Sequence, residues 1–537
     1  MANQTIFASQ ATKNKLISNE AGGRAFQLDD RQALAQLAAT GTLNHTFYQN
    51  AQAQLEQVLV FTQNVGPTFI AKTAVYARKN NHMKDMPVLL LAILSQRDQA
   101  LFKAMFPSII DNGKQLRNFI QIMRSGAIQR KSLGSLPKKM INQWLVNASD
   151  NQLLSANIGN QPSLADVLKM THPKPKDVAQ DAFFAYVLGK KYELEQLPVK
   201  VQALEKFRQG LTQDVPDLPM QLLTNLSLSA QQWAEIAKNG GWQMLRMNLN
   251  TFARHGVFQI EGMDNVIANK LQDQDMIRKS RVLPYQLMAT WAALDDAVPQ
   301  IVRQALEQVM QAALENVPRL TGRVVVAIDV SGSMASPVTG YRKGATSELR
   351  CVDVASLFAC ALKQVNPEIE IMPFDTQLHS LNITENESDQ ASLFARLKQV
   401  FYSSKTRSIF EVAKQFAALG GGGTDCSIPL KRLNRDQTAV DLMIYFSDNE
   451  SWADQLRPRH KTGMLYEWDI LKQRCPEAKL VCVDLQPYTH TQVPERTDTI
   501  NIGGFSDEVF RLINLFAQDK MHSDHWVNEI EKIELPT

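Results

Sequence analysis

The chain has 537 residues, of which 44% are hydrophobic and 21% charged, and its formal net charge at pH 7 is +3. This length exceeds one ordinary hydrophobic core, so we expect two or more domains in a globular protein. No apolar run reaches the ~18 residues needed to cross a bilayer. The opening "MANQTIFASQATKNKLISNE" lacks the apolar core of a signal peptide. We therefore expect a cytoplasmic protein without a membrane partner.

Up to about residue 320 the apolar pattern is helical. Segments such as "PTFIAKTAVYARKN", "DMPVLLLAILSQ", "NGKQLRNFIQIMRSG" and "LPKKMINQWLVNAS" carry apolar residues three and four apart. A long succession of helices favours stacked pairs, as in a HEAT-like α-solenoid, and an irregular helical bundle is the alternative. We divide the chain into an N-terminal extension (1–20), a helical module (21–320) and a C-terminal domain (321–537).

Charge is distributed unevenly between these parts. Residues 1–320 hold 34 Lys and Arg against 25 Asp and Glu, whereas residues 321–537 carry a balance of −6. Residues 112–149 contain seven basic residues and no acidic one. Such a local excess attracts polyanions, although a short charge run is usually a plain solvated helix face.

After residue 318 strand-length apolar runs alternate with helical segments. The runs are "RVVVAIDV", "EIEIMPFD", "AVDLMIYFSD" and "KLVCVDLQ", with "DTINIGG" as a possible last strand. Continuous Val, Ile and Leu runs fit parallel strands that are covered on both faces. The alternation predicts a doubly wound α/β domain, so the overall fold class is α + α/β.

Oxygen-bearing side chains gather at the ends of these predicted strands. Asp329, Ser331 and Ser333 alternate after the first strand and point one way. The loop "LGGGGTDCS" supplies Thr424, and "IYFSDNE" supplies Asp448. Carboxyl ends of parallel strands share one edge, and hard cations bind oxygen donors of this type. We expect a divalent cation there, most simply Mg²⁺, with Mn²⁺ and Ca²⁺ as alternatives; the loops could also keep this shape without metal.

This combination resembles the metal-ion-dependent adhesion site of the von Willebrand factor A fold. The resemblance implies that the three hydroxyls ligate the ion, directly or through water, and that the two aspartates ligate it or hold waters. In other A domains an acidic group of a partner completes the octahedron. No histidine or further carboxylate in these loops looks like a general base, so we expect a protein that is not an enzyme.

With the helical part, the chain resembles the Ro autoantigen family, which joins a TROVE module to an A domain, and we expect a bacterial member. The matching stretches include "NEAGGRAFQLDDRQALAQLAATG", "RSGAIQRKSLGSLPKKMINQWL", "DVLKMTHPKP", "KSRVLPYQLMATW" and "GGTDCSIP". The resemblance implies that the helical repeats form a ring. It also implies binding of small noncoding Y-type RNAs and of loose 3′ ends of misfolded RNAs. The expected role is a ribonucleoprotein subunit in RNA quality control or degradation, with an exoribonuclease as a possible partner and no DNA.

The resemblance also selects RNA-binding candidates. His172 in "THPKP" matches a His-x-Lys-Pro motif that faces RNA in the family, and Lys174 follows it. The matching basic segment supplies Arg124, Arg130, Lys131, Lys138 and Lys139. Helical spacing at i, i+7 and i+14 predicts that Arg124, Lys131 and Lys138 share one face.

One departure and one rival interpretation remain. The family carries a basic pair shortly before the motif histidine, whereas "LLSANIGNQPSLAD" here has no positive charge. The rival is a protein-interaction scaffold, in which the helical part binds peptide and the A domain binds a carboxylate-bearing partner without RNA. The acid-free basic run separates the two, because a peptide scaffold does not need it.

Overall fold

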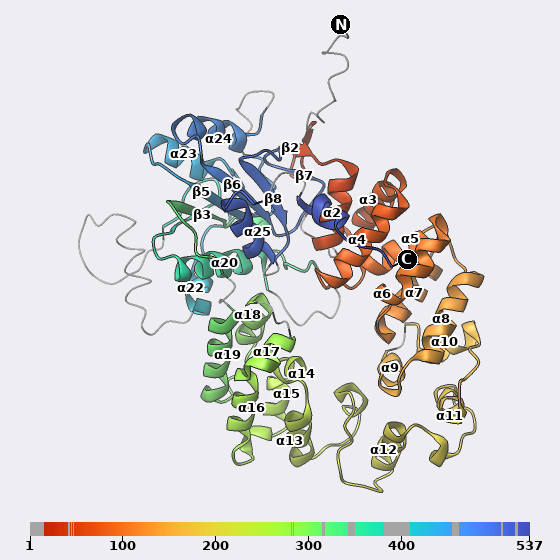
Figure 1. Cartoon of the computed structure of the whole chain (residues 1–537). Helices are drawn as coiled ribbons and strands as arrows, with labels where there is room; N and C mark the ends of the chain where they lie inside the picture. Colours follow the sequence, from red (N-terminus) through yellow and green to blue (C-terminus); the bar gives the residue numbers. More distant parts are fainter. Residues whose placement is uncertain are drawn as a thin grey trace. The chain divides into compact units, whose positions relative to one another are not determined.

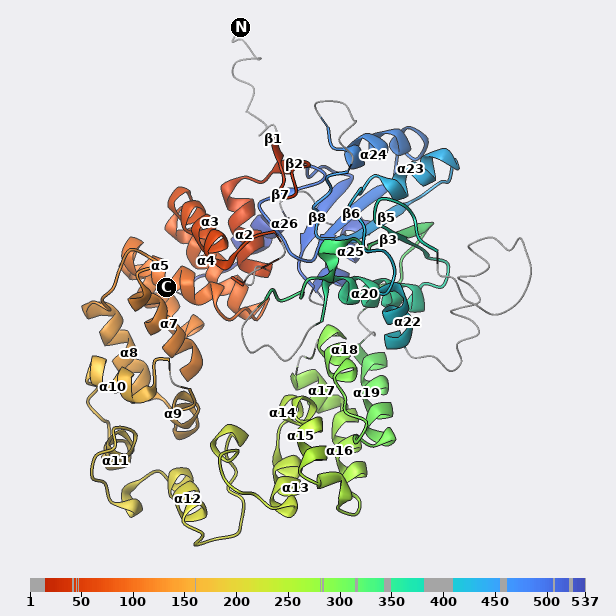
Figure 2. The same cartoon turned by 180° about the vertical axis from the view of Figure 1, so that it is seen from behind.

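The computed structural model describes residues 15–40, 43–44, 46, 48–159, 161–280, 282, 284–313, 317–341, 349–380, 409–453, 461–505, 508–520 and 525–536. The chain forms two compact units (Figures 1 and 2). Unit 1 comprises residues 1–64, 283–289 and 311–529, and unit 2 comprises residues 65–282, 290–310 and 530–537. This grouping differs from the predicted division at residue 320, because the N-terminal residues pack with the C-terminal ones.

Unit 1 is built on a five-stranded parallel sheet of order β4-β3-β5-β6-β8. All five predicted strands are confirmed: β3 (Val324–Asp329), β4 (Glu370–Phe374), β5 (Leu442–Ser447), β6 (Lys479–Asp484) and β8 (Thr499–Gly503). Every residue of β3, β5 and β8 is buried, which explains why these runs lack a polar alternation.

Helices cover both faces of this sheet, as the doubly wound fold requires (Figure 1). On one face Trp468 and its neighbours on α23 (Ile428–Arg435) and α24 (Gly463–Arg474) pack with alternate strand residues such as Met443 and Cys482. On the other face Phe358 of α20 (Cys351–Val365) lies 5.7 Å from Phe446 and 4.9 Å from Phe510 of α25 (Glu508–Ala517), measured between ring centroids. The helix α22 (Ile409–Phe416) packs against α20.

A second, antiparallel sheet joins the N-terminal region to the C-terminal one within unit 1. Its strand order is β1 (Leu16–Ser18), β2 (Arg24–Gln27) and β7 (His490–Thr491). Two helices, α2 (Asp30–Thr40) and α3 (Ala51–Asn64), follow the hairpin and pack on each other. The prediction that the pattern is helical up to about residue 320 was therefore wrong at this hairpin, whose strands are too short to leave a period-2 signal.

Unit 2 is helical, and successive helices pack mainly on near neighbours in the chain. Side-chain caps start several of them; Asp98, for example, accepts a hydrogen bond from the Leu101 N–H at the start of α6. The buried rings of Phe102, Phe106 and Phe119 form one aromatic cluster between α6 and α7. The helical fold class is confirmed, whereas the HEAT-like repeat and the ring stay predictions. The helices are α4 (Pro67–Lys79), α5 (Met86–Arg97), α6 (Gln99–Ile109), α7 (Gly113–Ser125), α8 (Ser135–Asn147), α9 (Asp150–Ala156), α10 (Leu164–Thr171), α11 (Val178–Val187), α12 (Val199–Arg208), α13 (Ala230–Asn239), α14 (Trp242–Met247), α15 (Leu249–Arg254), α16 (Met263–Gln272) and α17 (Gln274–Ser280).

Three further helices contain residues of both units, because the chain passes from one unit to the other within each of them. They are α18 (Pro284–Ala292), α19 (Gln300–Ala313) and α26 (His525–Glu531). No helix in the part of the chain that the structure describes is both long and apolar enough to span a membrane.

Candidate functional site

Two of the five predicted metal ligands lie at adjacent strand ends. Asp329 is the last residue of β3, and Asp448 directly follows the last residue of β5, the strand that pairs with β3. Both carboxylates are fully buried, at 0% and 1% exposure. The parallel sheet therefore brings these two charged groups to one edge, as the strand pattern predicts.

The two serines of the D-x-S-x-S loop fold back onto these strand ends. The Ser331 N–H donates to Asp329 Oδ1 at 2.9 Å, and the Ser331 and Ser333 hydroxyl oxygens lie 3.2 Å apart. Ser333 also lies close enough to Asp448 to oppose the rise in the pKa of that carboxyl group that burial causes. The Ser447 hydroxyl donates to Asp329 Oδ2 at 2.6 Å. The loop thus places two hydroxyl oxygens directly beside two carboxylates.

The glycine-rich loop joins this edge through backbone hydrogen bonds. Gly421 N–H donates to the Val330 carbonyl at 2.8 Å, and Gly332 N–H donates to the Gly422 carbonyl at 2.9 Å. Gly420 has φ +72°, and a Cβ there would lie 2.3 Å from the Val330 carbonyl oxygen. Only glycine fits such a close, left-handed position.

Thr424, the third predicted hydroxyl ligand, lies where the glycine loop meets the loop after β5. Its carbonyl accepts hydrogen bonds from the Trp452 and Ala453 N–H groups, at 3.1 and 3.0 Å. The residue is buried, at 1% exposure. Backbone pairing therefore links all three predicted loops, which carry the five predicted ligands, at one edge of unit 1; we call this region the metal edge.

Burial and mutual repulsion destabilise the ionised carboxylates of the metal edge when no cation is bound. The pKa of Asp329 is raised by burial and by the charge of Asp448, and burial raises the pKa of Asp448 as well. Two carboxyl groups that the sequence analysis missed behave alike. Burial, with a smaller effect of the Asp448 charge, raises the pKa of Glu450 to about 9 and that of Asp484 to about 8. Four buried carboxyl groups thus share one neighbourhood.

Positive charge from the protein does not compensate this cluster. Among the described residues, no Lys or Arg forms an ion pair with any of these four groups; His490 Nε2 lies 3.2 Å from Glu450 Oε1 but without hydrogen-bond alignment. Burial lowers the pKa of His490 to about 4, so it is neutral near pH 7. The buried oxygen Asp448 Oδ2 has no hydrogen-bond partner. A divalent cation would satisfy this oxygen and offset the repulsion, so the residues fit such an ion.

The donor set also indicates which type of ion fits. Within the described ranges no three His, Cys, Asp or Glu side chains converge as a metal-binding group. A cation at this edge would therefore depend on the hydroxyls of Ser331, Ser333 and Thr424 as well as on carboxylates. Oxygen-only donors favour a hard ion such as Mg²⁺ over zinc.

The predicted RNA-binding residues lie in unit 2 on α7, α8, α10 and the connections beside them. Arg124 lies on the last turn of α7, and its guanidinium is 3.1 Å from the Met170 sulfur on α10. Lys131 packs over Gly126, since a Cβ on Gly126 would lie 3.4 Å from Lys131 Cε. The Asn142 side chain of α8 donates to the carbonyl of Thr171, the residue before His172. These contacts hold α7 and α8 against α10, so the elements that bear the predicted residues pack on one another.

One detail of the prediction was wrong. Arg124, Lys131 and Lys138 do not share a face of one helix, because α7 ends at Ser125 and α8 starts at Ser135. Gly126 and Gly134 have φ values of 87° and 78°, which a helix cannot continue through. The two glycines in "SGAIQRKSLGS" could have indicated this break.

The same basic residues are free for a ligand. Arg124, Lys131, Lys138, Lys139 and Lys174 are exposed, and Arg130 is half-buried. Taken over the described ranges of the structure, none of these six cations forms an ion pair. His172 is also exposed and ends α10 in the left-handed conformation, with φ 51°. Lys169, which the sequence analysis missed, is exposed one turn earlier on α10.

Other cations of unit 2, which precede this basic segment in the chain, are held by the protein itself. Arg78 pairs with Asp111 at 2.7 Å, and Lys72 pairs with Glu531 at 3.1 Å. Arg97 donates to the Val65 carbonyl at 2.9 Å. The basic residues counted in the sequence therefore divide into two sets. One set is bonded within the protein, and the other forms no ion pair among the described residues.

The segment that lacks the family's basic pair receives a positive charge from another helix. Arg117 of α7 is buried, and its guanidinium donates to the carbonyls of Ile158 and Pro162. A Cβ on Gly159 would lie 2.4 Å from Arg117 Nη1, so the chain closes tightly around this group. Because carbonyls occupy the guanidinium, it shapes the segment and does not replace an exposed basic pair.

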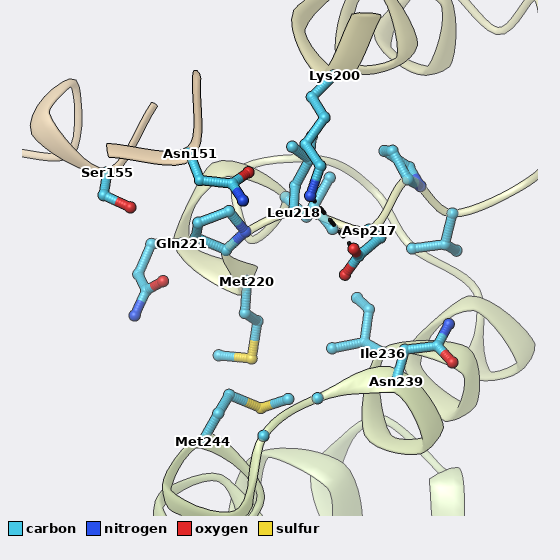
Figure 3. Close-up of a pocket in the computed structure, with 16 residues that line it drawn as sticks. Asn151, Ser155, Lys200, Asp217, Leu218, Met220, Gln221, Ile236, Asn239 and Met244 are labelled. Atoms are coloured by element: carbon cyan, nitrogen blue, oxygen red, sulfur yellow. Dashed lines mark hydrogen bonds and ion pairs between the residues drawn. The ribbon is translucent and has the colours of Figure 1, made fainter. Parts of the chain in front are cut away.

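Unit 2 also contains a pocket of about 400 Å³ between α9, α12, α13, α14 and the chain near Met220 (Figure 3). Met220, Met244 and Ile236 give it apolar walls, and the Lys200 ammonium lies 3.3 Å from Asp217 Oδ2 at its rim. Its lining contains no histidine and no cysteine. The pocket thus offers neither a general base of the usual type nor an unpaired charge.

Comparisons with known proteins agree with this architecture. A family model described as the Ro60 vWA domain matches residues 323–517, and one described as the TROVE domain matches residues 214–407. The solved structure of the Deinococcus radiodurans RO (RSR) protein has a TM-score of 0.61 and 19% identity, and covers 92% of this chain and 100% of that chain. The structural likeness shows a common fold.

Sequence relatives carry the same family name. The RNA-binding protein RO60 of Deinococcus radiodurans is 22% identical over 94% of this chain and 96% of its own length. The RNA-binding protein RO60 of Caenorhabditis elegans is 24% identical over 51% of this chain and 40% of its own length. With both domain types matched in one chain, this protein belongs to the Ro60 family of TROVE and von Willebrand factor A domain proteins.

Proposed function

We propose that this chain is an RNA-binding protein whose helical unit holds RNA and whose A domain holds a divalent cation for partner recruitment. The observation that carries the RNA assignment is the unpaired basic set on α7, α8, α10 and their connections. Exposed cations without carboxylate partners lose no existing ion pair when they bind phosphate. Phosphate contacts of this kind supply most sequence-independent affinity for RNA.

The finer expectations are Y-type RNAs and structured RNAs with single-stranded 3′ ends. Two relatives named RNA-binding protein RO60 support RNA as the ligand class. Because the predicted contacts are cations and one exposed histidine, base-specific readout should be weak and sequence selectivity modest. We place the protein in cytoplasmic RNA quality control as a ribonucleoprotein subunit, with an exoribonuclease as the candidate partner.

In the A domain, Ser331, Ser333, Thr424, Asp329 and Asp448 would hold Mg²⁺ directly or through water. When bound, the ion would supply positive charge and an open position for an acidic group of a partner protein. The chain's own residues keep the hydroxyls oriented and the carboxylates together. We assign no catalytic role, since the metal edge offers no aligned general base and nucleophile pair among its described residues.

The scaffold alternative rests on the pocket of unit 2. Its apolar walls and amide side chains suit a peptide side chain. That alternative does not use the unpaired cations outside the pocket, so we rank it second. Purified protein that carries no nucleic acid, as judged by its absorbance ratio at 260 and 280 nm, would favour the scaffold.

The experiment is a titration of one structured RNA with a free 3′ end, at salt concentrations from ~50 to ~200 mM. Replacement of Lys131, Lys138 and Lys139 by Glu should weaken binding at least tenfold and reduce the dependence on salt. A charge-matched control replaces three exposed lysines elsewhere in unit 2, Lys190, Lys191 and Lys206, by Glu.

In the same titration Asp329→Ala should keep RNA affinity within about threefold while it removes the cation. Equal losses in the test and control triples would contradict a localised basic surface. A tenfold loss in Asp329→Ala would contradict the division of labour between the two units.

A further inference from the structure

Two N-terminal stretches of unit 1 reach the metal edge. They are residues 16–27, which contain β1 and β2, and the group Asn44, Thr46, Tyr48 and Gln49; together we call them the clasp. The Asn19 side chain donates to the Ser451 carbonyl at 2.8 Å and accepts from the Gly23 N–H at 2.6 Å. This places a tight turn directly on the loop that follows β5.

The turn is connected to a predicted metal ligand by two hydrogen bonds. The Ala21 N–H donates to Glu450 Oε2 at 3.0 Å, and the Glu450 N–H donates to Asp448 Oδ1 at 3.3 Å. Gln49 links the two stretches of the clasp, because its amide donates to Glu20 Oε1 at 2.6 Å. Displacement of the turn would therefore release the Asp448–Ser451 loop from its outer support.

Tyr48 connects the clasp to the hydroxyl side of the metal edge. Tyr48 lies beside Ser333, whose side chain opposes the rise in the Tyr48 pKa that burial causes, and its ring lies against Tyr488, with 6.2 Å between ring centroids. A serine hydroxyl has one proton and two lone pairs. The Tyr48 phenol can donate to a neighbouring hydroxyl oxygen, which a phenylalanine ring cannot do. The Ser333 hydroxyl also forms a 3.2 Å hydrogen bond with the Ser331 hydroxyl, so Tyr48 lies next to a pair of predicted ligands.

We propose that the clasp is the outer wall of the metal site, with Tyr48 and Ala21 as positioning groups, so that cation binding and clasp docking strengthen each other. The inference rests on the proposed metal site and adds to it a part of the chain remote in sequence. Coupling between two events is reciprocal: whatever the clasp adds to cation affinity, the cation adds to clasp docking. Tyr48 and Ala21 are not ligands in this arrangement; they fix the ligands Ser333 and Asp448.

The test separates this role from a purely structural one. Cation affinity is measured by titration calorimetry with Mn²⁺ and Mg²⁺ on the full chain, and hydrogen exchange of residues 16–27 is followed with and without cation. In the wild type, saturating cation should slow exchange in residues 16–27. A hairpin that only holds the fold together would show the same exchange in both states.

Two variants perturb the clasp without changing a ligand. Tyr48→Phe removes one hydrogen-bond donor and should weaken cation affinity about threefold to tenfold. Gly23→Ala would place a Cβ 1.9 Å from the Ser451 carbonyl oxygen, so the turn must leave the loop, and a loss of tenfold or more is expected. Gly66→Ala is the control, because a Cβ there meets nothing within 4 Å; its affinity should stay within twofold.

The outcomes are distinguishable. A wild type that binds no divalent cation refutes the metal site, and the coupling with it. A wild type that binds cation while Tyr48→Phe and Gly23→Ala both keep its affinity refutes the coupling alone. If Gly23→Ala fails to fold, Tyr48→Phe decides, since it keeps the ring and its contact with Tyr488.

Discussion

The buried carboxyl groups of the metal edge predict how stability depends on pH and on metal. The pKa values of Asp484 and Glu450 are raised to about 8 and about 9, and that of Asp329 is raised as well. Between pH 6 and 8 the folded, metal-free protein therefore keeps protons that the unfolded chain has released. Stability then falls as pH rises, because the folded state binds more protons than the unfolded state.

The size of the effect follows from the number of protons retained. Each retained proton costs about 1.4 kcal/mol per pH unit, so a single group that stays protonated across the range, such as Glu450, already lowers stability by about 2.7 kcal/mol from pH 6 to pH 8. For a unit of 150–250 residues or more this is a drop of roughly 5–10 °C in Tm. Bound Mg²⁺ favours the ionised carboxylates and should remove most of this slope. The stabilisation by Mg²⁺ is therefore expected to be larger at pH 8 than at pH 6.

Thermal melts of chelator-treated protein at pH 6, 7 and 8, with and without 5–10-fold excess Mg²⁺ over the measured Kd, check this expectation. Asp484→Asn serves as the matched variant, since it removes one titrating group that is not a predicted ligand. Its metal-free Tm should vary less with pH than that of the wild type. A metal-free Tm that rises or stays level from pH 6 to pH 8, or a Mg²⁺ effect that does not grow with pH, would refute the reasoning.

Three further variants test single features. Gly420→Ala forces a left-handed φ and a 2.3 Å approach of its Cβ to the Val330 carbonyl oxygen, so cation affinity should fall at least tenfold in calorimetry while the helical circular dichroism of the chain persists. Phe102→Ala removes a fully buried ring and should lower the free energy of unfolding by about 3–5 kcal/mol in denaturant melts, and a loss below about 1 kcal/mol would contradict the packing. Asp98→Ala removes the cap on the Leu101 N–H and should cost about 1 kcal/mol in the same assay, whereas no change would show that water replaces the cap.

Much of the A domain could be predicted from sequence because its signals are local. Each buried strand is a continuous apolar run, and Asp329 and Asp448 stand where such runs end. Asp484 ends "KLVCVDLQ" in the same way, so strand-end reasoning alone could have added it. Glu450 carries no comparable signal, since its significance comes from its burial beside Asp448.

The remaining errors come from contacts that sequence spacing does not encode. The strands β1 and β2 are very short, and β2 pairs with β7, which lies close to the opposite end of the chain. Nothing in the sequence around Tyr48 indicates that its side chain lies beside Ser333. The break between α7 and α8 is different, because both glycines were visible and the left-handed conformation of Gly126 at the end of α7 follows from ordinary helix-ending rules.

The separation of the clasp from its partners sets an order of events during synthesis. Asn19 leaves the ribosome 432 residues before Ser451, the group it binds. The helices from α4 to α17 of unit 2, which contact mainly near neighbours, are complete long before that and can fold while translation continues. Unit 1 can close only after the loop beyond β5 and β7 have been made. A nascent chain arrested before residue 449 would therefore carry the helices from α4 to α17, without residues 530–537 of unit 2, and a clasp whose partners Glu450 and Ser451 have not been made.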